Sequence, residues 1–194
     1  NLRFVVLTSP NRDDLSDGGA SHYAAIVSEI HAAYPEVKVE VLIPDFQGNM
    51  DHLQVVLDAN PDVLNHNIET VSSLYTTARK GSLYKRSLAV LKEVKNRRPD
   101  ILTKTGLMLG LGEEKEELLC AFEDISKQNV DILTLGQYLK PSRENLDVVK
   151  YYHPDEFEFY KEEALKRDIR FVFSGPWVRS SYLADHVFED VLAV

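Results

Sequence analysis

The sequence predicts an α/β fold with parallel strands, and it favours a partial (β/α) TIM-type barrel over a doubly wound sheet. Short apolar runs rich in β-branched residues alternate with longer segments whose apolar residues recur at helical spacing. Polar residues follow nearly every run, whereas a doubly wound sheet gathers its ligand chemistry at one switch point. Both architectures remain compatible with this pattern. Five or six runs are too few to close an eight-stranded barrel, so we expect the barrel to be open or to lack strands.

The apolar runs are short enough to be buried strands, and the segments between them have one apolar and one charged face. The predicted strands are residues 3–8, 37–43, 63–68, 101–109, 131–135 and, as a sixth candidate, 170–174. The predicted helices are residues 22–34, 50–59, 71–79 continuing through 82–97, 115–128 and 154–167. We find no internal repeat, linker or shift of composition, and we therefore expect residues 1–194 to form a single domain.

Composition excludes several classes of protein. Of the 194 residues, 44% are hydrophobic and 27% are charged, which is too apolar for disorder, and no uncharged run is long enough to span a membrane. The net charge of −9 argues against a nucleic-acid surface, because the densest basic cluster covers only residues 95–98. The chain opens on an apparent strand without an initiator Met, and from this we infer that an upstream part is missing.

The chain contains a single cysteine, Cys120. One cysteine allows no internal disulfide, which favours a reducing compartment, and it cannot hold a metal cluster that requires several thiolates. Because Cys120 shares the apolar face of a predicted helix with Leu119 and Phe122, we expect it in the core.

The segment 65–70 carries the most pointed site prediction. In an extended backbone Asn65, Asn67 and Glu69 lie on one face, and a strand rarely has three polar residues on one face without a ligand or water to satisfy them. His66 points to the other face, where a structural histidine is more common than a metal ligand.

Other polar or glycine-rich segments are weaker candidates. The two glycines at 18–19 suit either a ligand near a helix N-terminus or a solvated turn. The spaced glycines at 106–112 admit a flat group such as a purine against Met108 or Leu111, or they only ease helix–strand packing. Gln137 is a candidate hydrogen-bonding residue at the barrel mouth. Residues 179–181 are either a site or a loop whose arginine pairs with a carboxylate.

Segments spread in order over nearly the whole chain closely resemble the lipoyl synthases. They are residues 6–9, 12–15, 17–20, 40–48, 66–71, 103–113, 133–139 with 141–142, and 174–176 with 178–182. Lipoyl synthases belong to the radical S-adenosylmethionine enzymes and have a partial (β/α) barrel. The resemblance identifies this chain as the C-terminal portion of such an enzyme.

The resemblance implies a sulfurtransferase that cleaves S-adenosylmethionine reductively and inserts two sulfur atoms at C6 and C8 of a protein-bound octanoyl-lysine. It also implies two 4Fe–4S clusters in the full-length enzyme, held by two sets of three cysteines. Neither set is present here, so this chain alone is not expected to catalyse. The implied partners are an octanoylated lipoyl domain, from a 2-oxoacid dehydrogenase E2 or the glycine cleavage H protein, and a reductant such as ferredoxin or flavodoxin. We expect a bacterial cytoplasmic protein, with the mitochondrial or plastid matrix as alternatives.

Strand-end position and resemblance together predict the lining of the S-adenosylmethionine and substrate cavity. These residues are Thr8, Ser9, Asn65, Asn67, Glu69, Met108 and Gln137. A serine of the segment 179–182 would be the fourth ligand of the auxiliary cluster, and we assign Ser180, with Ser181 as the second choice. No catalytic residue is assigned.

Two other functions are compatible with parts of the sequence. The missing cysteines suit a cluster-free barrel that binds S-adenosylmethionine or a lipoyl domain without catalysis. A magnesium-dependent aldolase-like barrel using Asp13, Asp45 and Glu113 is a more distant alternative, because acids at the start of helices are usually solvated.

Overall fold

The computed structural model describes residues 2–181 and contains one six-stranded parallel sheet. Its strands are β1 (Phe4–Thr8), β2 (Lys38–Leu42), β3 (Val63–Asn65), β4 (Leu102–Leu109), β5 (Ile132–Gln137) and β6 (Phe171–Gly175). The spatial order β1-β2-β3-β4-β5-β6 follows the sequence, and every neighbouring pair is parallel. A doubly wound sheet would reverse its order at a switch point, so this order confirms the barrel-type prediction. Among the described residues β1 and β6 do not pair, and the barrel is open.

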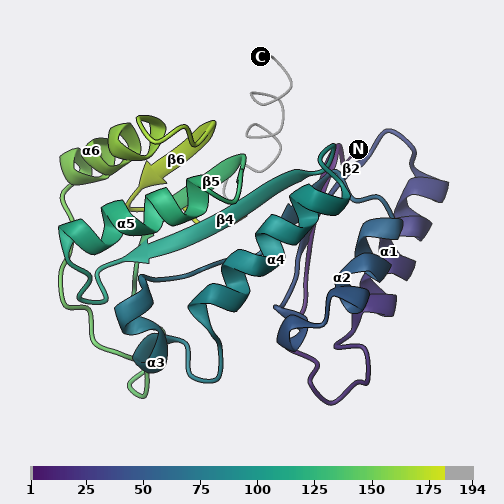
Figure 1. The fold of residues 1–194 in the computed structure, drawn as a ribbon, viewed down its shortest axis with the longest axis horizontal. Helices are drawn as coiled ribbons and strands as arrows, with labels where there is room; N and C mark the ends of the chain where they lie inside the picture. Colours follow the sequence, from purple (N-terminus) through teal and green to yellow (C-terminus); the bar gives the residue numbers. More distant parts are fainter. Residues whose placement is uncertain (1, 182–194) are drawn as a thin grey trace.

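The helices follow the strands as the periodicity predicts (Figure 1). They are α1 (Ala20–Ala33), α2 (Met50–Asp58), α3 (Tyr75–Ala78), α4 (Tyr84–Arg97), α5 (Lys115–Ser126) and α6 (Pro154–Leu165), with 3-10 turns η1 (Phe46–Gly48) and η2 (Ser72–Leu74). The segment predicted as one helix continuing from 71 to 97 is divided. Gly81 has a φ of 86°, a left-handed conformation that interrupts the helix before α4 begins.

The two faces of the sheet have different chemistry. The outer face packs against the helices through alternate strand residues such as Val39, Val41 and Leu64. On the inner face Leu102, Ile132 and Phe171 form a small apolar cluster near the N-terminal ends of their strands. Above this cluster the inner face is polar, and Glu40 and Lys104 form a buried ion pair of 2.9 Å. The inner face can therefore hold a polar site toward the C-terminal ends of the strands.

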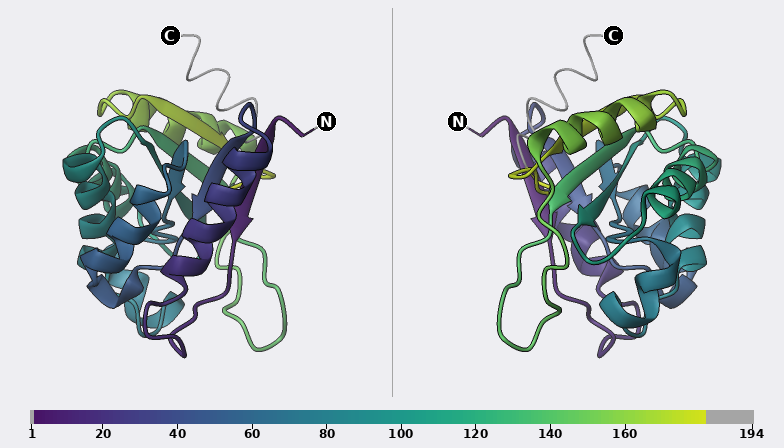
Figure 2. Two further views of the ribbon diagram at one scale, coloured as in Figure 1. Left: turned by 90° about the vertical axis from the view of Figure 1, so that its right-hand side faces the viewer. Right: turned by 90° about the vertical axis from the view of Figure 1, so that its left-hand side faces the viewer.

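Two long connections leave the sheet from the C-terminal ends of β1 and β5. Figure 2 shows the purple connection after β1 and the green connection after β5 extending from the same end of the molecule. Residues 2–181 contain no helix with the length and apolar character needed to cross a membrane.

Candidate functional site

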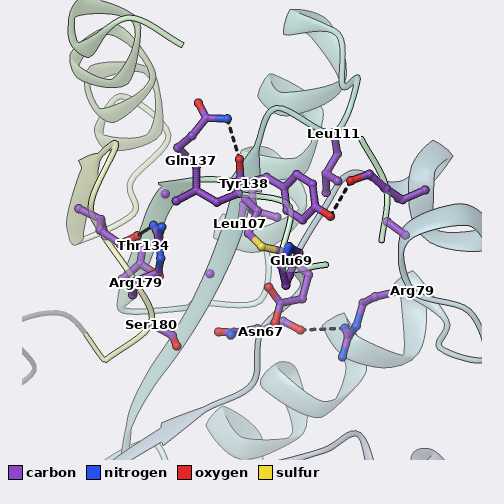
Figure 3. A pocket seen from close by; sticks show the side chains of 18 of the residues that line it. Asn67, Glu69, Arg79, Leu107, Leu111, Thr134, Gln137, Tyr138, Arg179 and Ser180 are labelled. Atoms are coloured by element: carbon purple, nitrogen blue, oxygen red, sulfur yellow. Dashed lines mark hydrogen bonds between the residues drawn. The ribbon is translucent and has the colours of Figure 1, made fainter. Parts of the chain in front are cut away.

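A cavity of about 590 Å³ lies at the C-terminal ends of β4, β5 and β6 and beside the segment that follows β3 (Figure 3). This volume is within the range of about 300–1,000 Å³ that small-molecule sites occupy. Its lining combines charged, amide, hydroxyl and apolar groups. The lining includes Asn67, Glu69, Arg79, Gly106, Leu107, Met108, Leu111, Thr134, Gly136, Gln137, Arg179 and Ser180.

The structure brings most of the predicted site residues together. Asn67, Glu69, Met108, Gln137 and Ser180 all line this cavity. They come from four different parts of the chain, which meet because the carboxyl ends of parallel strands share one edge of the sheet. The contact of each with a cofactor stays a prediction.

Three predicted residues lie outside the lining. Thr8 ends β1 and Ser9 follows it, at the far edge of the open sheet from β5 and β6. Ser9 donates a hydrogen bond to the carbonyl of Pro10. Asn65 is fully buried below the cavity and donates to Glu40 Oε1 at 2.8 Å. The extended segment predicted over 63–68 ends at Asn65, and Glu69 has a φ of 70°. Asn65 and Glu69 therefore do not belong to one continuous strand face.

Glu69 and Arg79 give the cavity one potential anion and one cation. The Glu69 backbone is fixed across β4, because its N–H donates to Gly106 at 2.8 Å and its carbonyl accepts from Met108 at 2.8 Å. Burial raises the pKa of the Glu69 carboxyl, while a hydrogen bond from Asn67 and the charge of Arg79 act in the opposite direction. A ligand with a positively charged group beside Glu69 would favour the ionised carboxylate.

One wall of the cavity is apolar and lacks side-chain bulk. Met108 and Leu111 contribute apolar surface beside Gly106. A Cβ atom at Gly106 would lie 2.8 Å from Thr134 Oγ1 and 3.1 Å from Asn67 Oδ1, so only glycine leaves these two polar groups in place. Asn67 Oδ1 is buried and accepts no hydrogen bond from the described residues. This wall suits a flat ligand group that approaches the backbone closely, as the glycine spacing predicts.

Gly136→Ala is expected to deform this site. A Cβ atom at Gly136 would collide with the backbone carbonyl oxygen of Val178. Because this atom belongs to the backbone, no side-chain movement can relieve the collision. We expect a loss of about 1–3 kcal/mol of unfolding free energy, typical of overpacking, measured by urea denaturation. Gly175→Ala is the matched control, because its Cβ would meet Val178 Cγ2 at an ordinary 3.5 Å. Equal losses in both variants would contradict the steric account.

The connection between β5 and α6 forms another wall and is fixed by side chains at the strand ends. Gln137 Nε2 donates to the carbonyls of Tyr138 and Lys150, and Gln137 Oε1 accepts from the N–H of Tyr152, all at 3.0 Å. In Figure 3 the Gln137 amide points away from Glu69 and Asn67. Gln137 therefore lines the cavity but uses its amide to hold the wall.

The Glu113 carboxylate accepts hydrogen bonds from the N–H groups of Gly110 and Leu111 at 2.6 and 2.9 Å.

Sequence reasoning missed Arg79 and Thr134 as members of the lining, whereas Arg179 belongs to a segment for which a site and a plain loop were both left open. Arg79 lies within a segment predicted to be plain helix, and Thr134 lies inside a predicted strand, so neither carried a strand-end signal. Arg179 Nη1 bonds the carbonyl of Val178 at 2.7 Å instead of the carboxylate that the loop interpretation expected. Ser180 lines the cavity, whereas Ser181 is exposed and does not. Residue 182, which completes the motif, lies outside the described residues.

The cysteine prediction is wrong. Cys120 is exposed on α5, because it lies on the solvent side of the helix whereas Leu118, Ala121 and Phe122 face the core. Within residues 2–181 no group of three His, Cys, Asp or Glu side chains is placed to hold a metal ion. The residues of this chain therefore do not fit a 4Fe–4S cluster, which requires thiolates that it lacks.

Residues 1–125 match the radical SAM superfamily. The chain belongs to this superfamily, the class that its open parallel barrel and its strand-end cavity also suit. Two solved structures share the fold. They are methylornithine synthase, with a TM-score of 0.59 and 11% identity over 98% of this chain and 67% of that one, and a domain of pyruvate-formate lyase-activating enzyme from Bacteroides vulgatus, with a TM-score of 0.60 and 10% identity over 87% of this chain and 98% of that one.

Within the superfamily the chain is similar to lipoyl synthases. It is 52% identical to the lipoyl synthase of Desulfotalea psychrophila over 97% of this chain and 63% of that protein. It is 52% identical to that of Koribacter versatilis over 94% of this chain and 60% of the relative, and 50% identical to that of Caldicellulosiruptor bescii over 98% and 65%. The chain thus spans about 60–65% of the length of these curated relatives.

Proposed function

We propose that this chain is the barrel portion of a lipoyl synthase and that its cavity binds S-adenosylmethionine. The observation that carries the proposal is identity of 50–52% over 94–98% of the chain, combined with one cavity that gathers the predicted residues Asn67, Glu69, Met108 and Gln137. In the complete protein the activity would insert two sulfur atoms, at C6 and C8 of a protein-bound octanoyl-lysine, to form the lipoyl group.

The lining suits S-adenosylmethionine chemically. The methionine end of this ligand carries an ammonium and a carboxylate, and Glu69 and Arg79 offer the opposite charges. The adenine requires a flat and largely apolar surface, which the wall at Gly106, Met108 and Leu111 provides. Bound here, S-adenosylmethionine would supply the radical chemistry by which hydrogen atoms leave the octanoyl chain. This chain's own residues would bind and orient it and exclude water.

The iron–sulfur clusters require ligands beyond this chain. The resemblance to lipoyl synthases implies two 4Fe–4S clusters in the full-length enzyme, yet the chain has one cysteine, which is exposed. Ser180, half-buried in the lining, is the proposed fourth ligand of the auxiliary cluster, with the exposed Ser181 as the second choice. The proposed partners are an octanoylated lipoyl domain, of an E2 subunit or the H protein, and a ferredoxin or flavodoxin reductant. The curated relatives are bacterial, and the bacterial cytoplasm is the proposed location.

Calorimetric titration of this chain with S-adenosylmethionine tests the cavity. We expect binding, and we expect Glu69→Gln and Arg79→Met each to weaken it about tenfold or more, because each removes a charged partner of the methionine end. Glu163→Gln, which changes a partly buried acid on α6 that pairs with Arg167 and lies outside the cavity lining, should bind like the unmodified chain. No binding by the unmodified chain, or equal binding by Glu69→Gln, would place the ligand elsewhere.

A cluster-free binding module is the second candidate, favoured by the single cysteine. A form of the protein extended upstream by the segment that bears the cysteines separates the two functions. After anaerobic iron–sulfur reconstitution, a lipoyl synthase takes up iron, releases 5′-deoxyadenosine under reduction and converts an octanoyl-lysine peptide. An extended form that binds S-adenosylmethionine but stays colourless and inert would support the binding module instead.

A further inference from the structure

Arg79 projects into the cavity from an element that cannot hold it rigidly alone. It follows α3, a single helical turn, and such a short helix has little stability of its own. Its Nη1 donates to the carbonyl of Asn67 at 2.8 Å, to Tyr75 Oη at 2.9 Å and to Ser87 Oγ at 3.2 Å. Within residues 2–181 its Nε and Nη2 make no hydrogen bond. One edge of the guanidinium is therefore fixed while the other remains available to a ligand.

The groups behind Arg79 form a buried chain of hydrogen bonds. Tyr75 Oη contacts Ser87 Oγ at 3.1 Å, Ser87 Oγ contacts His66 Nε2 at 3.0 Å, and His66 Nδ1 contacts the carbonyl oxygen of Ile43 at 2.9 Å. His66 and Ser87 are at most 1% exposed. His66 is the structural, hydrogen-bonded histidine that the sequence predicts, facing the helices instead of the cavity.

The two end groups of this hydrogen-bond chain, the Ile43 carbonyl and the Arg79 guanidinium, determine which partner donates in each hydrogen bond. A carbonyl oxygen only accepts, so His66 Nδ1 must carry a hydrogen, and the neutral ring then accepts at Nε2. Ser87 donates its hydrogen to Nε2 and accepts from the Tyr75 hydroxyl. The Tyr75 oxygen accepts from Arg79, which only donates. While the ring is neutral, no other arrangement of hydrogens satisfies all four bonds.

We propose that His66, Ser87 and Tyr75 are positioning residues, whose one-directional hydrogen-bond chain from the Ile43 carbonyl fixes the Arg79 guanidinium in the cavity to bind a ligand carboxylate. The direction of these hydrogen bonds follows from the contacts of the neutral ring. The identity of the carboxylate, that of S-adenosylmethionine, rests on the proposed function. A fixed planar fork binds a carboxylate better than a mobile one, because less side-chain freedom is lost on binding.

Nuclear magnetic resonance tests the direction without any ligand. Long-range proton–nitrogen correlation of the imidazoles, with the His66 signals assigned from a His66→Gln variant, should show the hydrogen on Nδ1. A hydrogen on Nε2 of His66 would overturn the proposal. In the unmodified protein Arg79 should show two resolved Nη signals, as a guanidinium with restricted rotation does. In the Tyr75→Phe variant these two signals should merge. Resolved signals that persist in Tyr75→Phe would also overturn it.

Ligand selectivity tests the positioning role. In Tyr75→Phe and Ser87→Ala, affinity for S-adenosylmethionine should fall about 5- to 20-fold, as expected for the loss of one or two supporting hydrogen bonds. Affinity for 5′-methylthioadenosine, which shares the adenosine and lacks the carboxylate, should change less than about twofold in both. A loss of affinity for both ligands, or for neither, would contradict positioning.

Tyr84→Phe is the matched control. Tyr84 is buried and packs edge-on against Tyr75 with ring centroids 5.3 Å apart. Its hydroxyl donates to Asp124, which is not part of the hydrogen-bond chain from Ile43 to Arg79. Both affinities should match those of the unmodified protein. If the unmodified protein binds neither ligand, the proposed function fails, while the tautomer and the Nη signals still decide the positioning inference.

Discussion

Replacing Lys104 by methionine is expected to cost about 3–5 kcal/mol of unfolding free energy, the amount typical of breaking a buried ion pair. Lys104 and Glu40 are 0% and 1% exposed on the inner face of the sheet, and their charged atoms are 2.9 Å apart. Glu40 also accepts a hydrogen bond from Asn65 at 2.8 Å. Lys104→Met therefore leaves a carboxylate buried with one amide donor. Urea denaturation, read as the midpoint and slope, measures the loss.

The double variant Glu40→Gln with Lys104→Met should recover more than half of that loss. A glutamine keeps an acceptor for Asn65 and carries no charge, so no uncompensated ion remains buried. Lys140→Met is the surface control. Lys140 pairs with Asp147 at 2.6 Å, but Asp147 is 88% exposed, and we expect a loss below about 1 kcal/mol. A double variant as unstable as the single one would show that the pair does not carry the effect.

This ion pair illustrates what the sequence reveals about the inner face. Glu40 and Lys104 each interrupt an apolar or β-branched run, a pattern that signals an unusual buried charge. They are 64 residues apart, and only the pairing of β2, β3 and β4 brings them together. Strand order is predictable from alternating elements, but which charges meet across the sheet depends on register, which no local pattern encodes.

The same distinction separates the site residues that were predicted from those that were not. Asn67, Glu69 and Met108 were found because polar or glycine-rich strand ends are visible locally. Thr8 carried the same signal, yet the open sheet leaves β1 at its far edge, and sequence order alone does not say how far a sheet curls. Arg79 was missed because its role depends on partners from α4 and from the segment after β3.

Stability is also expected to depend on His66 as the pH falls from about 6.5 to about 4. Burial lowers the pKa of His66 from 6.5 to about 4, and the charge of Arg79 acts in the same direction. Arg86 also lowers this pKa, whereas the Ile43 carbonyl and Asp45 raise it.

The sign follows from proton linkage. Between these pH values the unfolded chain binds a proton at His66 that the native protein excludes, so stability falls as the pH falls. Across the whole pH window the contribution of His66 to the unfolding free energy changes by about 3 kcal/mol. The contribution of Glu69 to the pH dependence has the opposite sign. Because its carboxyl pKa is raised in the native protein, stability falls as the pH rises above the carboxyl pKa of the unfolded chain.

Urea denaturation at several pH values between 7 and 4.5, compared between the unmodified protein and His66→Gln, isolates the histidine. Glutamine can donate to Ile43 and accept from Ser87, so we expect a loss of about 1–3 kcal/mol at pH 7 and a shallower pH dependence below 6.5. Tyr75→Phe should keep the full pH dependence, because it leaves both ring nitrogens of His66 bonded. An identical slope in His66→Gln would mean that other groups produce the acid sensitivity. A shallower slope in both variants would mean that protonation of His66 is coupled to all of the hydrogen bonds that lead to Arg79. In that case the binding of a ligand by Arg79 would also depend on pH.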